Sequence, residues 1–163
     1  MRKFFTKAKN WAAANVSVLV VLALVLALDR ISKVLAQTFL VQGPVAVGPF
    51  FQWNYVENTG SAFGMMQGAN GILIGVMLVI IAYLLHSWQE LCAQSKWVKW
   101  GCVLILAGAL GNLYDRITLG YVVDFLDFLV WPVFNVADSA ITLGGSLLVI
   151  SLFFHKKEKR EEK

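Results

Sequence analysis

VSVLVVLALVLAL, residues 16–28, is an uninterrupted run of apolar and small residues. A helix needs about 20 mostly apolar residues to cross a bilayer, and the flanking residues extend this run to about 11–35. Three further segments, 71–88, 98–114 and 136–154, have the same character. The sequence therefore predicts an all-α membrane protein, with four transmembrane helices in a bundle that forms one domain over residues 1–163.

The composition supports the same conclusion. Hydrophobic residues make up 58% of the chain and charged residues 15%, whereas a soluble domain is about 25% charged. The net charge of +4 could suggest a nucleic-acid partner. However, the basic residues gather at the two termini and in one loop, without a stripe of interleaved aromatics. We therefore expect membrane lipids, and no nucleic acid, as the surroundings.

The distribution of Lys and Arg predicts the orientation, because cytoplasmic loops are enriched in these residues. Eleven of the 14 occur at positions 2–9, 96–99 and 156–163, while residues 36–70 and 117–135 contain none. Both termini are therefore expected in the cytoplasm, and these two loops outside. We expect the first segment to be a retained span and not a cleaved signal peptide, because its apolar run is long and lacks a clear cleavage site.

Both outer loops are expected to be structured. Residues 50–57 (FFQWNYVE) are rich in aromatics and follow two Gly-Pro turns, which predicts a strand of a small sheet on the outer leaflet. Residues 121–130 are mostly apolar, with Asp124 and Asp127 three positions apart. This pattern favours a short helix lying at the membrane interface and ending at Trp131-Pro132.

Metal and cofactor chemistry is not expected. His86 and His155 both lie on the predicted cytoplasmic side, and the chain has no HExxH motif, Walker A motif or dinucleotide fingerprint. Cys92 and Cys102 lie near a predicted cytoplasmic loop, where thiols stay reduced. We expect them to be free cysteines that pack among apolar side chains.

Ionisable residues near a bilayer are costly and usually functional. Asp29 and Lys33 are four apart on one helix face, so they can form an ion pair that anchors the outer end of the first span. Asn112, Asp115 and Arg116 lie at the outer end of the third span. They could clamp helices together or contact a substrate.

Asp124 and Asp138 have no obvious local partner. They are expected on separate elements but at a similar depth, at the outer boundary of the membrane. Two adjacent carboxylates in a low dielectric tend to share one proton. One can then act as a base for water and the other as an acid, as in peptide hydrolysis by aspartic peptidases. Spacing alone leaves a helix cap or an ion-pathway carboxylate about equally open for either residue.

The alternative function is a small proton-coupled membrane transporter that uses the same acids as relay groups. A relay should place polar groups through the whole bilayer, yet the inner halves of the four predicted spans carry almost no charge. Acids at one end favour an enzyme. A scaffold protein would not need two isolated aspartates.

Five blocks occur in a fixed order along this topology: DRISK at 29–33, NTGSAFG at 58–64, GALGNLYDR at 108–116, VVDF at 122–125 and FNVAD at 134–138. With these blocks the chain resembles the lipoprotein signal peptidases (signal peptidase II) over nearly its whole length. Asp127 lies outside the blocks, and we expect it to be an ordinary exposed residue on the outer helix.

The resemblance implies an aspartic endopeptidase of the bacterial inner membrane with its site at the outer face. Such an enzyme removes the signal peptide of prolipoproteins by cleaving before a diacylglyceryl-modified cysteine, and globomycin inhibits it. The resemblance implies catalytic roles for Asp124 and Asp138, substrate-binding roles for Asn58, Asn112, Arg116 and Asn135, and supporting roles for Asp29, Lys33, Gly60 and Asp115.

Overall fold

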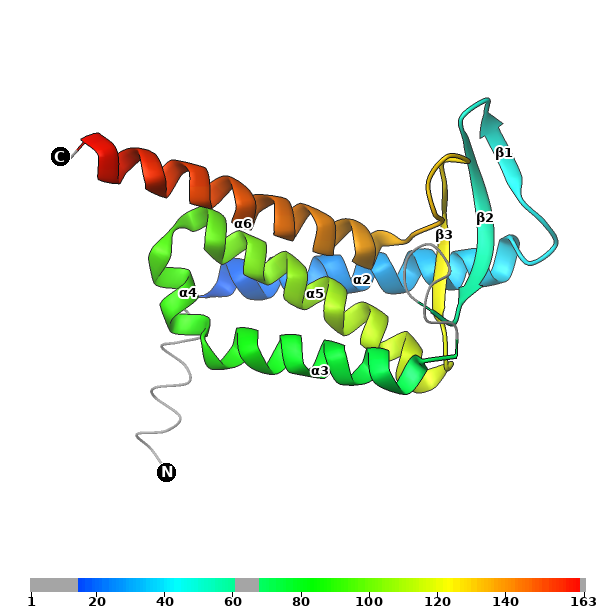
Figure 1. The fold of residues 1–163 in the computed structure, drawn as a ribbon. Coiled ribbons are helices and arrows are strands. Elements are labelled where there is room, and N and C mark those ends of the chain that lie inside the picture. Colours follow the sequence, from blue (N-terminus) through cyan, green and yellow to red (C-terminus); the bar gives the residue numbers. More distant parts are fainter. Residues whose placement is uncertain (1–14, 61–67, 162–163) are drawn as a thin grey trace.

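The computed structural model describes residues 15–60 and 68–161, with side chains up to residue 152. Long helices lie side by side, and a small sheet crosses the bundle at one end (Figure 1). In chain order the elements are α2 (Val16–Phe39), β1 (Val45–Gly48), β2 (Phe51–Asn58), α3 (Asn70–His86), α4 (Trp88–Gln94), α5 (Lys96–Thr118), β3 (Val122–Asp127) and α6 (Val136–Glu161).

Helix α5 is the centre of the bundle and packs against α2, α3, α4 and α6. Its contact with α6 is the most extensive, because glycines bring the two backbones together. A Cβ atom on Gly101 would lie 2.8 Å from the carbonyl oxygen of Gly144, and one on Gly108 would collide with the carbonyl oxygen of Ala137. Small residues at such crossings permit close helix packing.

The four predicted spans correspond to α2, α3, α5 and α6. Residues 11–14 of the first predicted span lie outside the described residues. Both α2 and α5 run about one turn further toward the sheet than predicted. The connection before α5 contains an additional short helix, α4, which is bent by 68° from α3.

By length and composition, α5 can cross a membrane, and α3 with α4 gives a second crossing if the bent pair is one broken span. Helix α2 is long enough but carries Asp29, Arg30 and Lys33, and the apolar part of α6, Val136–Leu152, is shorter. Large apolar side chains are exposed on the helices, while several charged side chains are buried between them. In a water-soluble bundle, large apolar side chains are mostly buried and charged side chains are mostly exposed.

The sheet has the order β1-β2-β3, and both strand pairs are antiparallel. The strand predicted over 50–57 is confirmed as β2, which pairs Gln52 with Asp127 of β3. Val123 and Phe125 of β3 pack with Ala36 of α2, so the sheet is attached to the end of the first helix.

The predicted interfacial helix over residues 121–130 is wrong, because residues 122–127 form strand β3. This strand pairs with β2 along one edge and is buried on both faces, so its four apolar residues, at positions 122, 123, 125 and 126, do not alternate with polar ones. A short continuous apolar run does not distinguish a buried strand from a helix by periodicity. Gly120, with φ of +87°, turns the chain from α5 into the strand.

Asp127 is also not the exposed residue that we expected. It is buried, and its Oδ2 atom accepts hydrogen bonds from Gln52 Nε2 (2.7 Å) and Asn54 Nδ2 (3.0 Å). Its Oδ1 atom accepts one from the backbone N–H of Leu129 (2.8 Å). The hydrogen bond from Gln52 helps to hold the pKa of Asp127 below its ordinary value. Asp127 therefore joins the two long strands and the following turn.

Adjacent glycines in α6 test the close packing of α5 and α6. A Cβ on Gly144 would lie 2.6 Å from the carbonyl oxygen of Gly101, whereas a Cβ on Gly145 meets nothing within 4 Å. We expect Gly144→Ala to lower the free energy of unfolding by roughly 1–3 kcal/mol through overpacking. Gly145→Ala, the matched control, should be neutral or stabilising by up to about 1 kcal/mol. Thermal unfolding in detergent measures both, and equal destabilisation would contradict this packing.

Candidate active site

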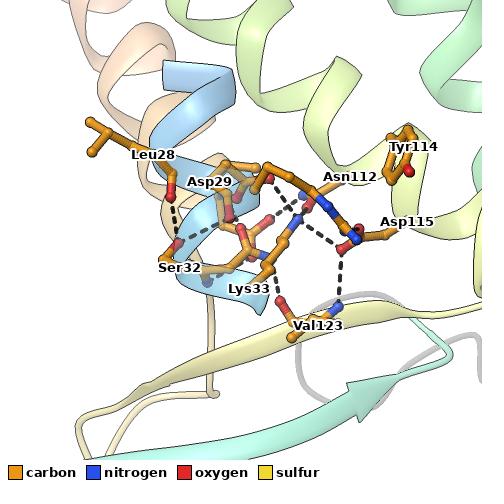
Figure 2. Close-up of polar contacts among 12 residues, drawn as sticks. Leu28, Asp29, Ser32, Lys33, Asn112, Tyr114, Asp115 and Val123 are labelled. Carbon is orange, nitrogen blue, oxygen red and sulfur yellow. Dashed lines mark hydrogen bonds and ion pairs between the residues drawn. The ribbon is translucent and has the colours of Figure 1, made fainter. Parts of the chain in front are cut away.

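The ammonium group of Lys33 is fully buried between α2 and α5 (Figure 2). Its Nζ atom lies 2.9 Å from Asp29 Oδ2 and 2.9 Å from Asp115 Oδ2, and it donates to Asn112 Oδ1 at 3.0 Å. An ammonium has three N–H donors, so these three partners satisfy it completely. The ion pair predicted between Asp29 and Lys33 is confirmed.

The two carboxylates of this cluster also bind the backbone of other elements. Asp29 Oδ1 accepts from the N–H of Ala137 at the start of α6 (2.9 Å), and Asp115 Oδ2 accepts from the N–H of Val123 in β3 (3.2 Å). A Cβ on Gly111 would lie 2.6 Å from Asp29 Oδ2, so this position has no room for a side chain. The cluster therefore joins α2, α5, α6 and β3.

Asn112 lies between Lys33 and Asp138 and hydrogen-bonds both. Its Oδ1 atom accepts from Lys33 and from Asn135 Nδ2 (3.2 Å), and its Nδ2 atom donates to Asp138 Oδ1 (2.7 Å). Because an ammonium can only donate, the oxygen of the Asn112 amide must face Lys33. The amide nitrogen must then face Asp138.

Asn135 and Asp138 form a reciprocal cap at the start of α6. Asn135 Oδ1 accepts from the backbone N–H of Asp138 (2.8 Å), and Asp138 Oδ2 accepts from the backbone N–H of Asn135 (3.2 Å). This is the arrangement of a capping box with Asn and Asp in place of Ser and Glu. The cap and Asn112 together give each oxygen of Asp138 one donor.

Asp124 projects from β3 and is 1% exposed. Its Oδ1 atom accepts from Asn135 Nδ2 (2.7 Å), and its Oδ2 atom accepts from Asn58 Nδ2 of β2 (2.8 Å). Burial raises the pKa of Asp124 to about 7, and the negative charge of Asp138 acts in the same direction. Asn135 therefore bridges two acids that are close enough to influence each other.

Arg116 lies beside this pair. Asn58 Oδ1 accepts from the N–H of Gly60 (3.0 Å), and the carbonyl of Gly60 accepts from Arg116 Nη2 (2.6 Å). Arg116 Nη1 donates to Asn70 Oδ1 (3.1 Å), and Asn70 Nδ2 donates back to the carbonyl of Arg116 (3.1 Å). Among the described side chains, Arg116 Nε is buried without a hydrogen-bond partner.

The structure brings all ten predicted site residues into one connected hydrogen-bond network, although their roles stay predictions. Asp124 and Asp138 are joined through Asn135, with no direct hydrogen bond between them. Two residues of the network were not predicted from the sequence: Asn70, the partner of Arg116, and Arg30, which pairs with Asp115 at 3.3 Å. The one signal for Asn70 was its polar side chain at the start of an apolar span.

In the parts of the chain that the structure describes, no group of three or more His, Cys, Asp or Glu residues could hold a metal ion.

Comparisons with known proteins identify relatives of this chain. A family model described as signal peptidase (SPase) II matches residues 21–154. A lipoprotein signal peptidase of Desulfitobacterium hafniense is 42% identical over 147 residues, which cover 88% of this chain and 97% of that protein. One of Moorella thermoacetica is 39% identical over 142 residues, covering 85% and 94% of the two chains.

Two solved structures share the fold of this chain. A structure described as a bacterial membrane enzyme superposes with a TM-score of 0.82 at 28% identity, and covers 90% of this chain and 93% of its own. A second structure of the same description has a TM-score of 0.73, covering 83% and 92%. On the extent of the family match and the identity to its members, this chain belongs to the signal peptidase II family.

Proposed function

We propose that this protein is a membrane aspartic endopeptidase that removes the signal peptide from prolipoproteins, with Asp124 and Asp138 as its catalytic pair. The cleaved bond precedes the diacylglyceryl-modified cysteine. The observation that carries the proposal is that Asn135 hydrogen-bonds both carboxylates, on β3 and α6, at the end of the bundle. Relatives named lipoprotein signal peptidase support the substrate class.

The chemistry requires one proton on the pair. The raised pKa of Asp124 supports the presence of such a proton, because a group with a pKa of about 7 is partly protonated at neutral pH. The ionised carboxylate takes a proton from water, which attacks the scissile carbonyl. The carboxylic acid hydrogen-bonds the carbonyl and then protonates the leaving nitrogen. The proton belongs to the coupled pair and not to one residue.

Arg116 is proposed to bind the substrate backbone through Nε, since a peptide carbonyl would satisfy this buried donor. Asn58, Asn112 and Asn135 also line the site. Their side-chain amide N–H groups point at the carboxylates or at neighbouring oxygens, which supports a role in orienting the pair before substrate arrives. Globomycin is proposed to compete for this site.

We further propose that α2, α3, α5 and α6 cross the bacterial inner membrane, with the sheet outside and both termini in the cytoplasm. Exposed apolar side chains along the helices support this placement. At the opposite end from the sheet, the Nζ atoms of Lys96 and Lys99 lie over the rings of Trp97 and Trp100. Basic and Trp side chains are enriched at membrane interfaces, with the basic ones on the cytoplasmic side.

The distribution of buried charge argues against the transporter alternative. In the described residues, the buried Asp, Lys and Arg side chains come from the sheet or from the parts of α2 and α5 nearest to it. Toward the other end of α6, Ser151 is the buried polar residue. A proton relay would need ionisable groups across the whole thickness of the bilayer.

Replacing either aspartate tests the catalytic pair. We expect Asp124→Asn and Asp138→Asn each to reduce cleavage of a diacylglyceryl prolipoprotein by roughly 10³-fold or more, since neither amide can transfer the proton. A gel-shift assay with purified protein measures this, with globomycin as inhibitor. Glu57→Gln, which removes an exposed acid next to Asn58, is the matched control and should retain activity. Substantial cleavage by a folded Asp124→Asn or Asp138→Asn variant would refute the assignment.

The pH dependence of cleavage tests the shared proton. Because burial raises the pKa of Asp124 from 3.8 to about 7, this proton is lost as the pH rises through that value. We expect kcat/KM to fall above about pH 7, approaching tenfold per pH unit. Tryptophan fluorescence at each pH checks that the protein stays folded. A kcat/KM that is constant from about pH 6 to 9 would contradict the mechanism.

Site-directed labelling tests the orientation. Tags inserted after Gly43, between α2 and β1, and near Leu119, after α5, should react with an impermeant reagent added outside intact cells. A tag inserted at Ser95, between α4 and α5, should react after the inner membrane is permeabilised. The opposite pattern would overturn the proposed topology while leaving the site geometry unchanged.

A further inference from the structure

The connection from β3 to α6 exposes four consecutive large apolar side chains, Phe128, Leu129, Val130 and Trp131, which we call the apolar spur. Their exposed fractions are 45%, 53%, 93% and 61%. Phe50, in the β1–β2 turn, is 77% exposed. Contiguous apolar surface of this kind on a protein marks an interaction site.

The base of the spur is fixed to the sheet. Phe128 packs against Phe51, with ring centroids 5.0 Å apart, and stacks on Phe134 at 5.8 Å. Leu126 and Phe134 are joined by a β-bridge that closes the loop. These contacts hold the two ends of the loop together, so its tip must point away from the sheet core.

The tip itself has a constrained backbone. Leu129 has φ of +64°, in the left-handed region, which is unfavourable for a residue with a Cβ atom. The hydrogen bond from its N–H to Asp127 Oδ1 (2.8 Å) supports this conformation, and Val130 N–H bonds the carbonyl of Phe128 (2.7 Å). The tip therefore presents Leu129 and Val130 outward from a tight turn.

The position of the spur indicates what it contacts. In Figure 1 the sheet crosses the helix ends, and its β1–β2 end, together with the loop from β3 to α6, projects past α6. Most of the exposed face of α6 is apolar and includes Leu143, Val149 and Leu152. Lipids whose acyl chains cover this face of α6 would have their head groups at the level of the projecting end of the sheet.

We propose that the apolar spur inserts into the outer-leaflet interface beside α6 and fixes the depth of Asp124 relative to the lipid. Lipid fits better than a protein partner, because residues 128–131 carry no charge and Trp131 is a residue type that prefers the membrane interface. The depth of Asp124 follows because strand β3, which carries that residue, ends at Asp127 and leads directly into the base of the spur at Phe128. This proposal requires membrane insertion of the helices but not peptidase activity.

A depth measurement in nanodiscs that each hold one protein copy tests the proposal. Cys92 and Cys102 are replaced with alanine, and Val130→Cys is labelled with an environment-sensitive fluorophore. Glu57→Cys, at an exposed charged position of β2, carries the same label as the matched control. Lipids with a spin label near the head group report contact with the bilayer, and iodide reports contact with water.

We expect quenching by the spin-labelled lipid to be about threefold stronger at position 130 than at position 57, with the reverse order for iodide. Equal iodide quenching at the two positions would overturn the proposal. Shielding of position 130 that appears only when several copies share a nanodisc would also overturn it, because a second copy would then be the occupant. Since no step depends on catalysis, failure here is distinguishable from failure of the proposed peptidase function.

Discussion

The buried ammonium of Lys33 is the constraint on which the arrangement of the site depends. Removing a charge from water costs several kcal/mol, and only close opposite charges and hydrogen bonds offset that cost. Asp29 and Asp115 supply both, and each also binds a backbone N–H of a different element. Four elements therefore have to meet at one point for the ammonium to be satisfied. Loss of one carboxylate would leave an uncompensated charge, at a cost of about 3–5 kcal/mol.

The same ammonium orders the polar side chains around it. Lys33 fixes the direction of the Asn112 amide, which then donates to Asp138. Asn135 completes the set, because its side-chain oxygen caps α6 while its side-chain nitrogen donates to Asp124. Each amide is thus held in one of its two orientations by its neighbours. Preorganised donors of this kind need no rearrangement when charge develops during a reaction.

The sequence predicted the features that depend on local pattern, and missed those that depend on distant contacts. Apolar segment length indicated the four long helices, and the spacing of four between Asp29 and Lys33 indicated their ion pair. Strand β3 was mistaken for a helix because burial on both faces removes the alternation that identifies a strand. Asp127 was mistaken for an exposed residue because Gln52 and Asn54 are 75 and 73 positions away in the chain.

The proposed pair has two different environments, which suits hydrolysis of a lipid-anchored substrate. Asp124 is 1% exposed, so burial keeps its proton near neutral pH, whereas Asp138 is partly open at the start of α6. Water and the scissile peptide would then approach from the side of Asp138 and Arg116, whose Nε atom has no hydrogen-bond partner among the described residues. The pair keeps one shared proton because burial disfavours two adjacent anions, and water would be activated on the partly exposed side of the pair, where it can reach a carboxylate. In the proposed topology the pair would lie at the boundary between bilayer and solvent, which would provide both conditions within one hydrogen-bond network.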